Sequence, residues 1–258
     1  MADSARGMRV LVTAGAAGIG KAFAETFANA GAKVFICDVD RAALDAFRAA
    51  HPEIGAGIAD VADPRQVEGL FDAAAVFLGG LDVLINNAGI AGPTAPVEDM
   101  DIADWDRTIA VDLNGMFYCT RKAVPLLKAA GGGSIINLSS VAGRLGFPLR
   151  TPYSAAKWAV VGFTKSLAIE LGPANIRVNA IQPGVVEGDR IERVISAKAK
   201  ALGESPDTIR HSMLAKVSLR RTVSPSDIAN MALFLATDAG RNISGQALSV
   251  CGNVETLV

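Results

Sequence analysis

Short apolar segments alternate with longer amphipathic segments along almost the whole chain, and this alternation restricts the fold more than any other feature. The predicted strands are Arg9–Thr13, Lys33–Cys37, Gly55–Ile58, Val83–Asn86, Ser134–Leu138, Arg177–Ile181 and Ala247–Val250. The predicted helices include Lys21–Ala30, Arg41–Ala50, Pro64–Phe77, Trp105–Lys128 and Tyr153–Leu171. Continuous apolar strands that alternate with helices are buried on both faces. The sequence therefore predicts an α/β fold, a doubly wound parallel β-sheet with helices on both faces.

The alternation runs through all 258 residues without a repeat, a low-complexity tract or a linker. We therefore expect one domain over 1–258. The segment 188–222 interrupts the pattern with two helix-like pieces, before the sequence Ser-Pro-Ser-Asp at 224–227 caps the next helix. An insertion that follows a strand end in such a sheet is typical of a lid or substrate-binding segment.

Charge and composition disfavour several kinds of partner. With 25 basic and 26 acidic residues the net charge is -1, which argues against nucleic acid or an anionic membrane surface as the main partner. No apolar run approaches the ~18 residues that cross a bilayer, and the first residues have no signal-peptide core. The three cysteines and two histidines are too scattered for a disulfide framework or a metal site. We expect a cytoplasmic protein that acts on a small molecule and holds no metal.

A glycine-rich turn, Thr-Ala-Gly-Ala-Ala-Gly-Ile-Gly at 13–20, follows the first predicted strand and opens the first helix. Glycines allow backbone N–H groups to reach a pyrophosphate, which then faces the helix N-terminus. The spacing differs from the G-x-G-x-x-G fingerprint, and such a turn can also be purely structural. Its place between the first strand and the first helix favours a dinucleotide site.

An acidic residue, Asp38, ends the second predicted strand. A carboxylate there can accept hydrogen bonds from both adenosine ribose hydroxyls and would repel a 2′-phosphate. No Arg or Lys lies in the glycine turn, and we expect the nearby Arg41 to face solvent. Asp38 therefore predicts NAD rather than NADP, the alternative being a helix-capping acid. Asp60 and Val61, after the third strand, are placed to contact the adenine edge.

Tyr153 and Lys157 lie four residues apart in a predicted helix, so their side chains share one face. An ammonium near a phenol favours the ionised phenol, which can exchange a proton with an alcohol at neutral pH. Ser140 follows an apolar strand, at the end where open parallel sheets place active residues. Any long helix offers such a pair, and the tyrosine could simply pack beneath a solvated lysine.

Together these residues resemble the classical branch of the short-chain dehydrogenase/reductase family, from about Arg9 to Gly252. The turn at 13–20 matches the family's TGxxxGIG, with Ala14 in place of the first glycine. The other matches are Asn-Asn-Ala-Gly at 86–89, the Ser140, Tyr153 and Lys157 set, and Asn-Ala-Ile-Gln-Pro-Gly at 179–184.

The resemblance implies a Rossmann-type fold and hydride transfer to a nicotinamide cofactor. Tyr153 would exchange the proton, Lys157 would bond the nicotinamide ribose, and Ser140 would position the substrate oxygen. The residues implied to line the cofactor are Gly15, Ala17, Gly18, Ile19, Asp38, Asp60, Val61, Asn87, Ala88, Gly89, Tyr153, Lys157, Pro183, Gly184 and Val186.

Two positions depart from the family pattern. Asp112 stands where the family has an Asn whose main-chain carbonyl anchors a proton relay to the lysine. We expect Asp112 to keep this catalytic role, although Asn114 lies two residues on. Gly188 stands where a Thr bonds the nicotinamide amide, so Glu187 or a main-chain N–H would have to replace that contact.

The segment 188–222 carries eight basic and four acidic residues, and two further arginines lie between Ser140 and the catalytic tyrosine. We expect Arg144, Arg150 and Arg190 as candidates to clamp a carboxylate, phosphate or sulfonate of the substrate. The alternative is that these charges belong to solvated helix faces and subunit contacts.

The sequence thus favours NAD-dependent interconversion of a secondary alcohol and a ketone, on a small polyol, sugar or hydroxy acid. One alternative is a 3-oxoacyl thioester reductase, which normally uses NADPH and is disfavoured by Asp38. Another is a catalytically silent NAD-binding scaffold, which the Ser140, Tyr153 and Lys157 set disfavours. The apolar helices 105–128 and 153–171 predict a homotetramer.

Overall fold

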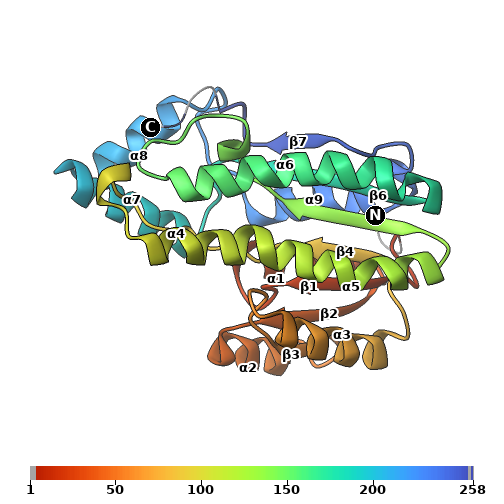
Figure 1. The fold of residues 1–258 in the computed structure, drawn as a ribbon. Helices are drawn as coiled ribbons and strands as arrows, with labels where there is room; N and C mark the ends of the chain where they lie inside the picture. The colour runs from red at the N-terminus through yellow and green to blue at the C-terminus, as the bar shows by residue number, and fades with distance from the viewer. Residues whose placement is uncertain (1–3, 255–256, 258) are drawn as a thin grey trace.

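A computed structural model describes residues 4–254 and 257. All neighbouring strands pair in parallel in one sheet, in the order β3-β2-β1-β4-β5-β6-β7 (Figure 1). The strands are β1 (Arg9–Thr13), β2 (Lys33–Asp38), β3 (Gly55–Ile58), β4 (Val83–Asn86), β5 (Gly133–Leu138), β6 (Ile176–Pro183) and β7 (Ala247–Val250). The order reverses between β1 and β4, where doubly wound sheets bind their ligands. The predicted fold is confirmed, and every predicted strand boundary lies within two residues of the observed one.

Helices cover both faces of the sheet because alternate strand residues point to opposite sides. Val10 and Val12 of β1 join one buried cluster, and Leu11 joins the other. The first cluster packs beneath α1 (Gly18–Asn29), α2 (Arg41–Ala50) and α9 (Pro225–Ala236). The second packs beneath α3 (Pro64–Leu78), α5 (Gly115–Ala129) and α6 (Thr151–Leu171). Short helical turns occur at η1 (Val97–Asp99), η3 (Val141–Gly143), η4 (Gly172–Ala174) and η5 (Asp238–Gly240).

The helix predicted over 105–128 is not continuous. It is divided into α4 (Ile102–Ile109), a π-helical turn η2 (Ala110–Asn114) and α5. A π-turn adds one residue without breaking the apolar periodicity strongly, so the sequence pattern does not reveal it. Asp112 lies within this turn, beside the predicted site.

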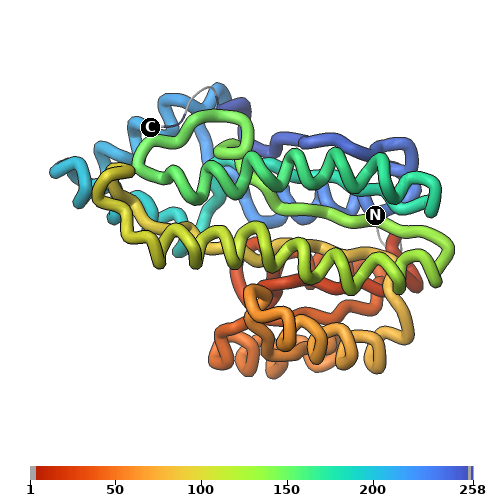
Figure 2. The backbone as a smooth tube through the Cα atoms, in the orientation of Figure 1, coloured from red at the N-terminus to blue at the C-terminus, as the bar shows by residue number. Residues whose placement is uncertain are grey.

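The segment 188–222 folds into two helices, α7 (Asp189–Leu202) and α8 (Pro206–Ala215), as predicted. They lie beyond the carboxyl end of β6, at the left of Figures 1 and 2. Ile195 and Met213 of this pair form a small buried cluster with Val141 of η3 and Val254 near the chain end. The segment is therefore anchored to the loop that follows Ser140.

The part of the chain that the structure describes contains no helix long and apolar enough to cross a membrane. Within the same residues no group of three or more His, Cys, Asp or Glu side chains is arranged to hold a metal.

Candidate active site

The glycine turn between β1 and α1 is shaped for close approach of a ligand. A Cβ atom on Gly20 would lie 1.9 Å from the carbonyl oxygen of Ala14, so no other residue fits there. Gly18 has φ +53° and open space where a side chain would be. Ala17 precedes α1 without a side-chain cap, which leaves backbone N–H groups of the first turn available for a phosphate. These features fit a dinucleotide.

Asp38 lies against this turn, as its position at the end of β2 requires. Its Oδ2 accepts a hydrogen bond from the Ala16 N–H at 3.1 Å, and its Oδ1 accepts from the Asp40 N–H at 3.1 Å. Arg41 begins α2 and is exposed. The carboxylate is therefore fixed beside the glycine turn.

A link between β4 and the glycine turn was not foreseen from the sequence. The Asn87 side-chain amide donates to the carbonyls of Thr13 and Ala14 at 3.0 and 2.9 Å. The Thr13 hydroxyl accepts from the Asn87 and Ala88 N–H groups at 3.0 and 2.9 Å. The amide of Asn87 thus holds the turn in shape, and Thr13 is a positioning residue that its place in the turn could have indicated.

The other predicted cofactor positions lie along the same edge of the sheet. The Asp60 carboxylate pairs with Arg107 at 2.9 Å, and Val61 is buried against α3 and α5. Gly89 follows β4, while Pro183 ends β6 and Gly184 follows it. Val186 lies just beyond β6 and forms a bridge to Val223.

The tyrosine, the lysine and Asp112 lie close together in the structure. Lys157 is 3% exposed, and its Nζ donates to the Leu138 carbonyl at 3.0 Å. The same Nζ lies 5.5 Å from the centre of the Tyr153 ring. Ser140 caps η3, which packs against α6, and its hydroxyl accepts from the Ala142 N–H at 3.1 Å. The Ser139 hydroxyl, which the sequence did not single out, donates to the Lys157 carbonyl at 2.8 Å.

Asp112 reaches the lysine with its side chain. It is fully buried, and its Oδ2 lies 3.2 Å from Lys157 Nζ, in an ion pair whose geometry does not make a hydrogen bond. Its Oδ1 accepts from the Ile90 N–H at 2.6 Å. The π-turn directs this side chain inward, whereas Asn114 in the same turn is exposed. The expected relay through the main chain stays a prediction, and the ion pair is an additional contact.

The three candidate substrate arginines have different positions. Arg150 is buried, 5.1 Å above the centre of the Tyr153 ring, and its Nη2 donates to the Ala91 carbonyl. Arg190 is 5.8 Å above the same ring, with Nη1 3.0 Å from the Gly89 carbonyl on the cofactor side.

Arg144 has a structural partner instead. Its Nη2 donates to the Val254 carbonyl at 2.9 Å and so holds the C-terminal segment. This position does not support the expected substrate contact, because the guanidinium is used inside the fold. Glu187, considered for a nicotinamide contact, accepts a hydrogen bond from the Thr222 hydroxyl at 2.6 Å.

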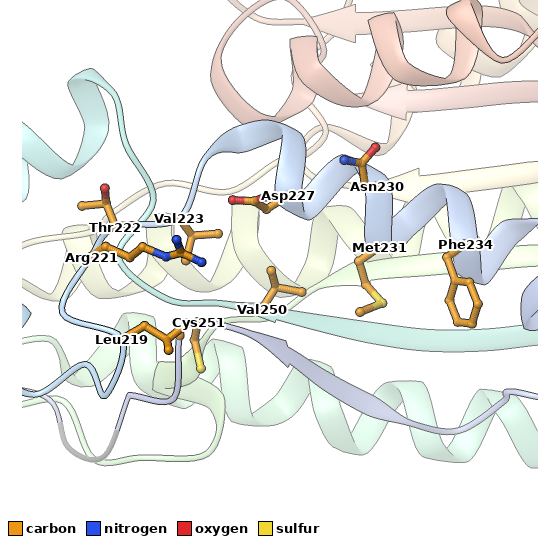
Figure 3. A pocket seen from close by; sticks show the side chains of 11 residues that line it. Leu219, Arg221, Thr222, Val223, Asp227, Asn230, Met231, Phe234, Val250 and Cys251 are labelled. Atoms are coloured by element: carbon orange, nitrogen blue, oxygen red, sulfur yellow. The ribbon is translucent and has the colours of Figure 1, made fainter. Parts of the chain in front are cut away.

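Two cavities lie near the site, but neither is lined by Ser140, Tyr153 or Lys157. The larger, about 400 Å³, lies between α9 and the end of β7, and Met231 and Phe234 point toward it from α9 (Figure 3). The smaller, about 210 Å³, lies between α7, α8 and the segment after β6.

The doubly wound sheet, the glycine turn and the Tyr–Lys pair at the carboxyl ends of the strands define an oxidoreductase of the Rossmann type. Residues 14–253 match the sequence profile of the family described as Enoyl-(Acyl carrier protein) reductase. The chain belongs to the short-chain dehydrogenase/reductase family, in its classical branch.

Three known proteins illustrate the similarity. Cis-4-hydroxycyclohexanecarboxylate dehydrogenase of Sinomonas cyclohexanicum is 38% identical over 245 residues, covering 94% of each chain. The 3-oxoacyl-[acyl-carrier-protein] reductase FabG of Thermotoga maritima is 35% identical over 248 residues, covering 95% of this chain and 96% of the relative. The crystal structure of NAD+-bound xylitol dehydrogenase superposes with a TM-score of 0.91 at 30% identity, covering 96% and 98% of the two chains.

Proposed function

We propose that the protein is an NAD-dependent oxidoreductase that interconverts a secondary alcohol and a ketone. The observation that carries the proposal is the buried ammonium of Lys157 beneath the Tyr153 ring, fixed by the Leu138 carbonyl and the Asp112 carboxylate. This arrangement suits a tyrosine that exchanges a proton with a substrate oxygen.

The residues of this chain would act on the oxygen of the substrate. In the oxidation, the Tyr153 hydroxyl in its ionised form takes the alcohol proton while Lys157 stabilises the phenolate. The Ser140 hydroxyl donates to the same oxygen and keeps it in register. When bound, the nicotinamide would supply the hydride chemistry.

The catalytic role is tested by the formation of NADH across a panel of polyols, aldoses and hydroxy acids. Tyr153→Phe should lower kcat by about 100-fold or more and leave NADH binding, followed by its fluorescence, nearly unchanged. An unchanged turnover in this variant would contradict the proposal and favour a silent NAD-binding scaffold.

The preference for NAD rests on Asp38, whose carboxylate is held at the turn by the Ala16 N–H. Asp38→Ser should raise the ratio of kcat/KM with NADP to that with NAD by about tenfold or more, because the repulsion of the 2′-phosphate is removed. Asp45→Asn, exposed on α2, removes the same charge away from the turn and should leave the ratio unchanged. A wild-type preference for NADP would contradict the proposal.

The substrate class is a small polyol, sugar or hydroxy acid. Two of the similar proteins are named for a hydroxycarboxylate and for xylitol, which supports this class. The description of the matched family and the FabG relative favour a second candidate, reduction of a 3-oxoacyl thioester. Efficient reduction of acetoacetyl-CoA with NADPH, but not of free oxo acids with NADH, would decide for that candidate.

A further inference from the structure

Two cationic side chains approach one aromatic ring beside the catalytic tyrosine. The ring belongs to Phe147, in the loop between Ser140 and α6. The guanidinium of Arg150 lies 5.2 Å from the centre of this ring, and the Nζ of Lys198 from α7 lies 5.6 Å from it. The two side chains are only 3% and 6% exposed.

Neither cation forms an ion pair with an acidic side chain among residues 4–254 and 257. Among the described residues, the Arg150 side chain makes one hydrogen bond, from Nη2 to the Ala91 carbonyl, and its buried Nε has no partner. The Lys198 ammonium makes no hydrogen bond and no ion pair within the described part of the chain. Burial of charge without a partner is unfavourable, so this pair requires an explanation.

The electrostatics of the pair agree with its geometry. Burial lowers the pKa of Lys198, Arg150 lowers it further, and Glu204 opposes them weakly. Burial also lowers the pKa of Arg150, and Asp112 and Tyr153 do not offset this. Each protonated side chain would therefore gain from a negative charge in direct contact with it.

Two neighbouring charged groups, Asp112 and Arg190, have other partners. The Asp112 carboxylate is bound by Lys157 and the Ile90 N–H. Arg190 is not part of the pair, because its guanidinium contacts the Gly89 carbonyl on the cofactor side. An anionic ligand would supply the counter-ion that no described acidic side chain gives Arg150 or Lys198 by direct contact.

We propose that Arg150 and Lys198 form an anion-binding subsite for the carboxylate of a short hydroxy or oxo acid. The guanidinium of Arg150 stands over the Tyr153 ring, so a carboxylate bound to it lies a few bonds from the oxygen that exchanges the proton. A short carboxylate suits two nearly buried cations better than a bulky phosphate ester. This subsite rests on the proposed function and specifies its substrate class.

The subsite is tested with 4-oxopentanoate and its methyl ester, which share the ketone and differ in charge. With NADH, kcat/KM for the acid should exceed that for the ester by about tenfold or more. Lys198→Met keeps most of the side-chain volume and should lower kcat/KM for the acid by about 10- to 100-fold, with less than ~3-fold change for the ester. Lys200→Met, on the exposed side of α7, is the matched charge control and should change neither value.

Arg150 is tested by a pair of variants. Arg150→Lys retains the positive charge and should keep most of the preference for the acid, whereas Arg150→Met should abolish it. Equal losses for acid and ester in Arg150→Met and Lys198→Met would assign both residues a structural role and overturn the subsite.

Binding of pentanoate, which has no ketone, separates the subsite from the reaction. Calorimetric titration of pentanoate into the protein with NADH should show binding that is weakened about tenfold in Lys198→Met. This binding result would support the subsite even if the protein reduced no ketone. A failure to reduce any ketone would refute only the proposed function. Absence of pentanoate binding, or tighter binding of inorganic phosphate, would overturn the carboxylate subsite even if neutral ketones were reduced.

Discussion

At the residue scale, the buried Asp112–Lys157 ion pair affects the charge around the catalytic phenol. The carboxylate offsets part of the positive potential of Lys157 at the Tyr153 ring, 5.5 Å from Nζ. An Asn at 112 has the same shape but no charge. The departure from the family's residue therefore changes electrostatics more than packing.

We predict that Asp112→Asn raises kcat for alcohol oxidation at neutral pH by about threefold or more, because the uncompensated ammonium favours the phenolate. The measurement is kcat at pH 7 for both proteins. Asp106→Asn, exposed on α4, is the charge control and should leave kcat unchanged. An unchanged kcat in Asp112→Asn would show that the pair has only a structural role.

Ala14 adopts φ +50°, a conformation that favours glycine and that the family's glycine would adopt at lower cost. We predict that Ala14→Gly raises the free energy of unfolding by about 0.5–1 kcal/mol. Ala17 is extended, with φ -145°, a conformation that alanine adopts without strain. Ala17→Gly should therefore lower the free energy of unfolding or leave it unchanged. Thermal unfolding of the two variants checks this, and a loss of stability in Ala14→Gly would contradict it.

At the scale of elements, an Arg–Asp pair joins β1 to β4 at the amino ends of the strands, opposite the site. Arg9 Nε and Nη2 donate to the two oxygens of Asp82, each at 2.8 Å, and the Arg9 N–H adds a third bond at 2.8 Å. Partial burial acts to raise the pKa of Asp82, but the hydrogen bonds from Arg9 outweigh it, and the pKa is lowered.

We predict that Asp82→Asn lowers the free energy of unfolding by about 1–2 kcal/mol at neutral pH. The folded-state pKa of Asp82 is below its unfolded value, so the stabilisation is complete above the ordinary carboxyl pKa and is lost as the pH falls through the folded value. Urea denaturation from pH 7 downward should show the difference between variant and wild type shrinking with acid. A difference between Asp82→Asn and wild type that stays constant with pH would contradict this linkage. The control Asp72→Asn, exposed on α3, should have the same stability as wild type at every pH.

At the scale of the whole molecule, two apolar surfaces lie outside the catalytic site. One consists of Phe117 on α5 and Trp158 and Ile169 on α6, which are 47%, 51% and 82% exposed on helices that cover the same face of the sheet. The other consists of Met231 and Phe234 beside the edge strand β7, at the hollow in Figure 3. A tetramer with two-fold axes needs two such separate self-complementary surfaces.

We therefore expect a homotetramer in sedimentation experiments at micromolar concentration. Trp158→Glu and Phe234→Glu should each block one surface and give dimers, because a buried unpaired carboxylate disfavours the contact. Val76→Glu, on the exposed side of α3, is the control and should remain tetrameric. Monomers alone in the wild type would refute the tetramer.

The sequence by itself determined the order and type of the elements, because apolar periodicity and glycine turns act over a few residues. It also placed Tyr153 above Lys157, since four residues separate them on one helix. Only the tertiary structure decided which side chains from distant parts of the sequence contact each other. Asp112 reaches Lys157 through a π-turn that the periodicity does not reveal.

The arginines show the same limit. Arg144 and Arg150 lie in one loop, yet the first turns to the C-terminal segment and the second to the catalytic ring. The backbone between them includes Leu149 at φ +63°, a conformation that its residue type does not predict. Local patterns thus determined the framework and the catalytic pair. The fold decided the Asp112–Lys157 ion pair and the directions of Arg144 and Arg150, because long-range packing fixes where charged side chains converge.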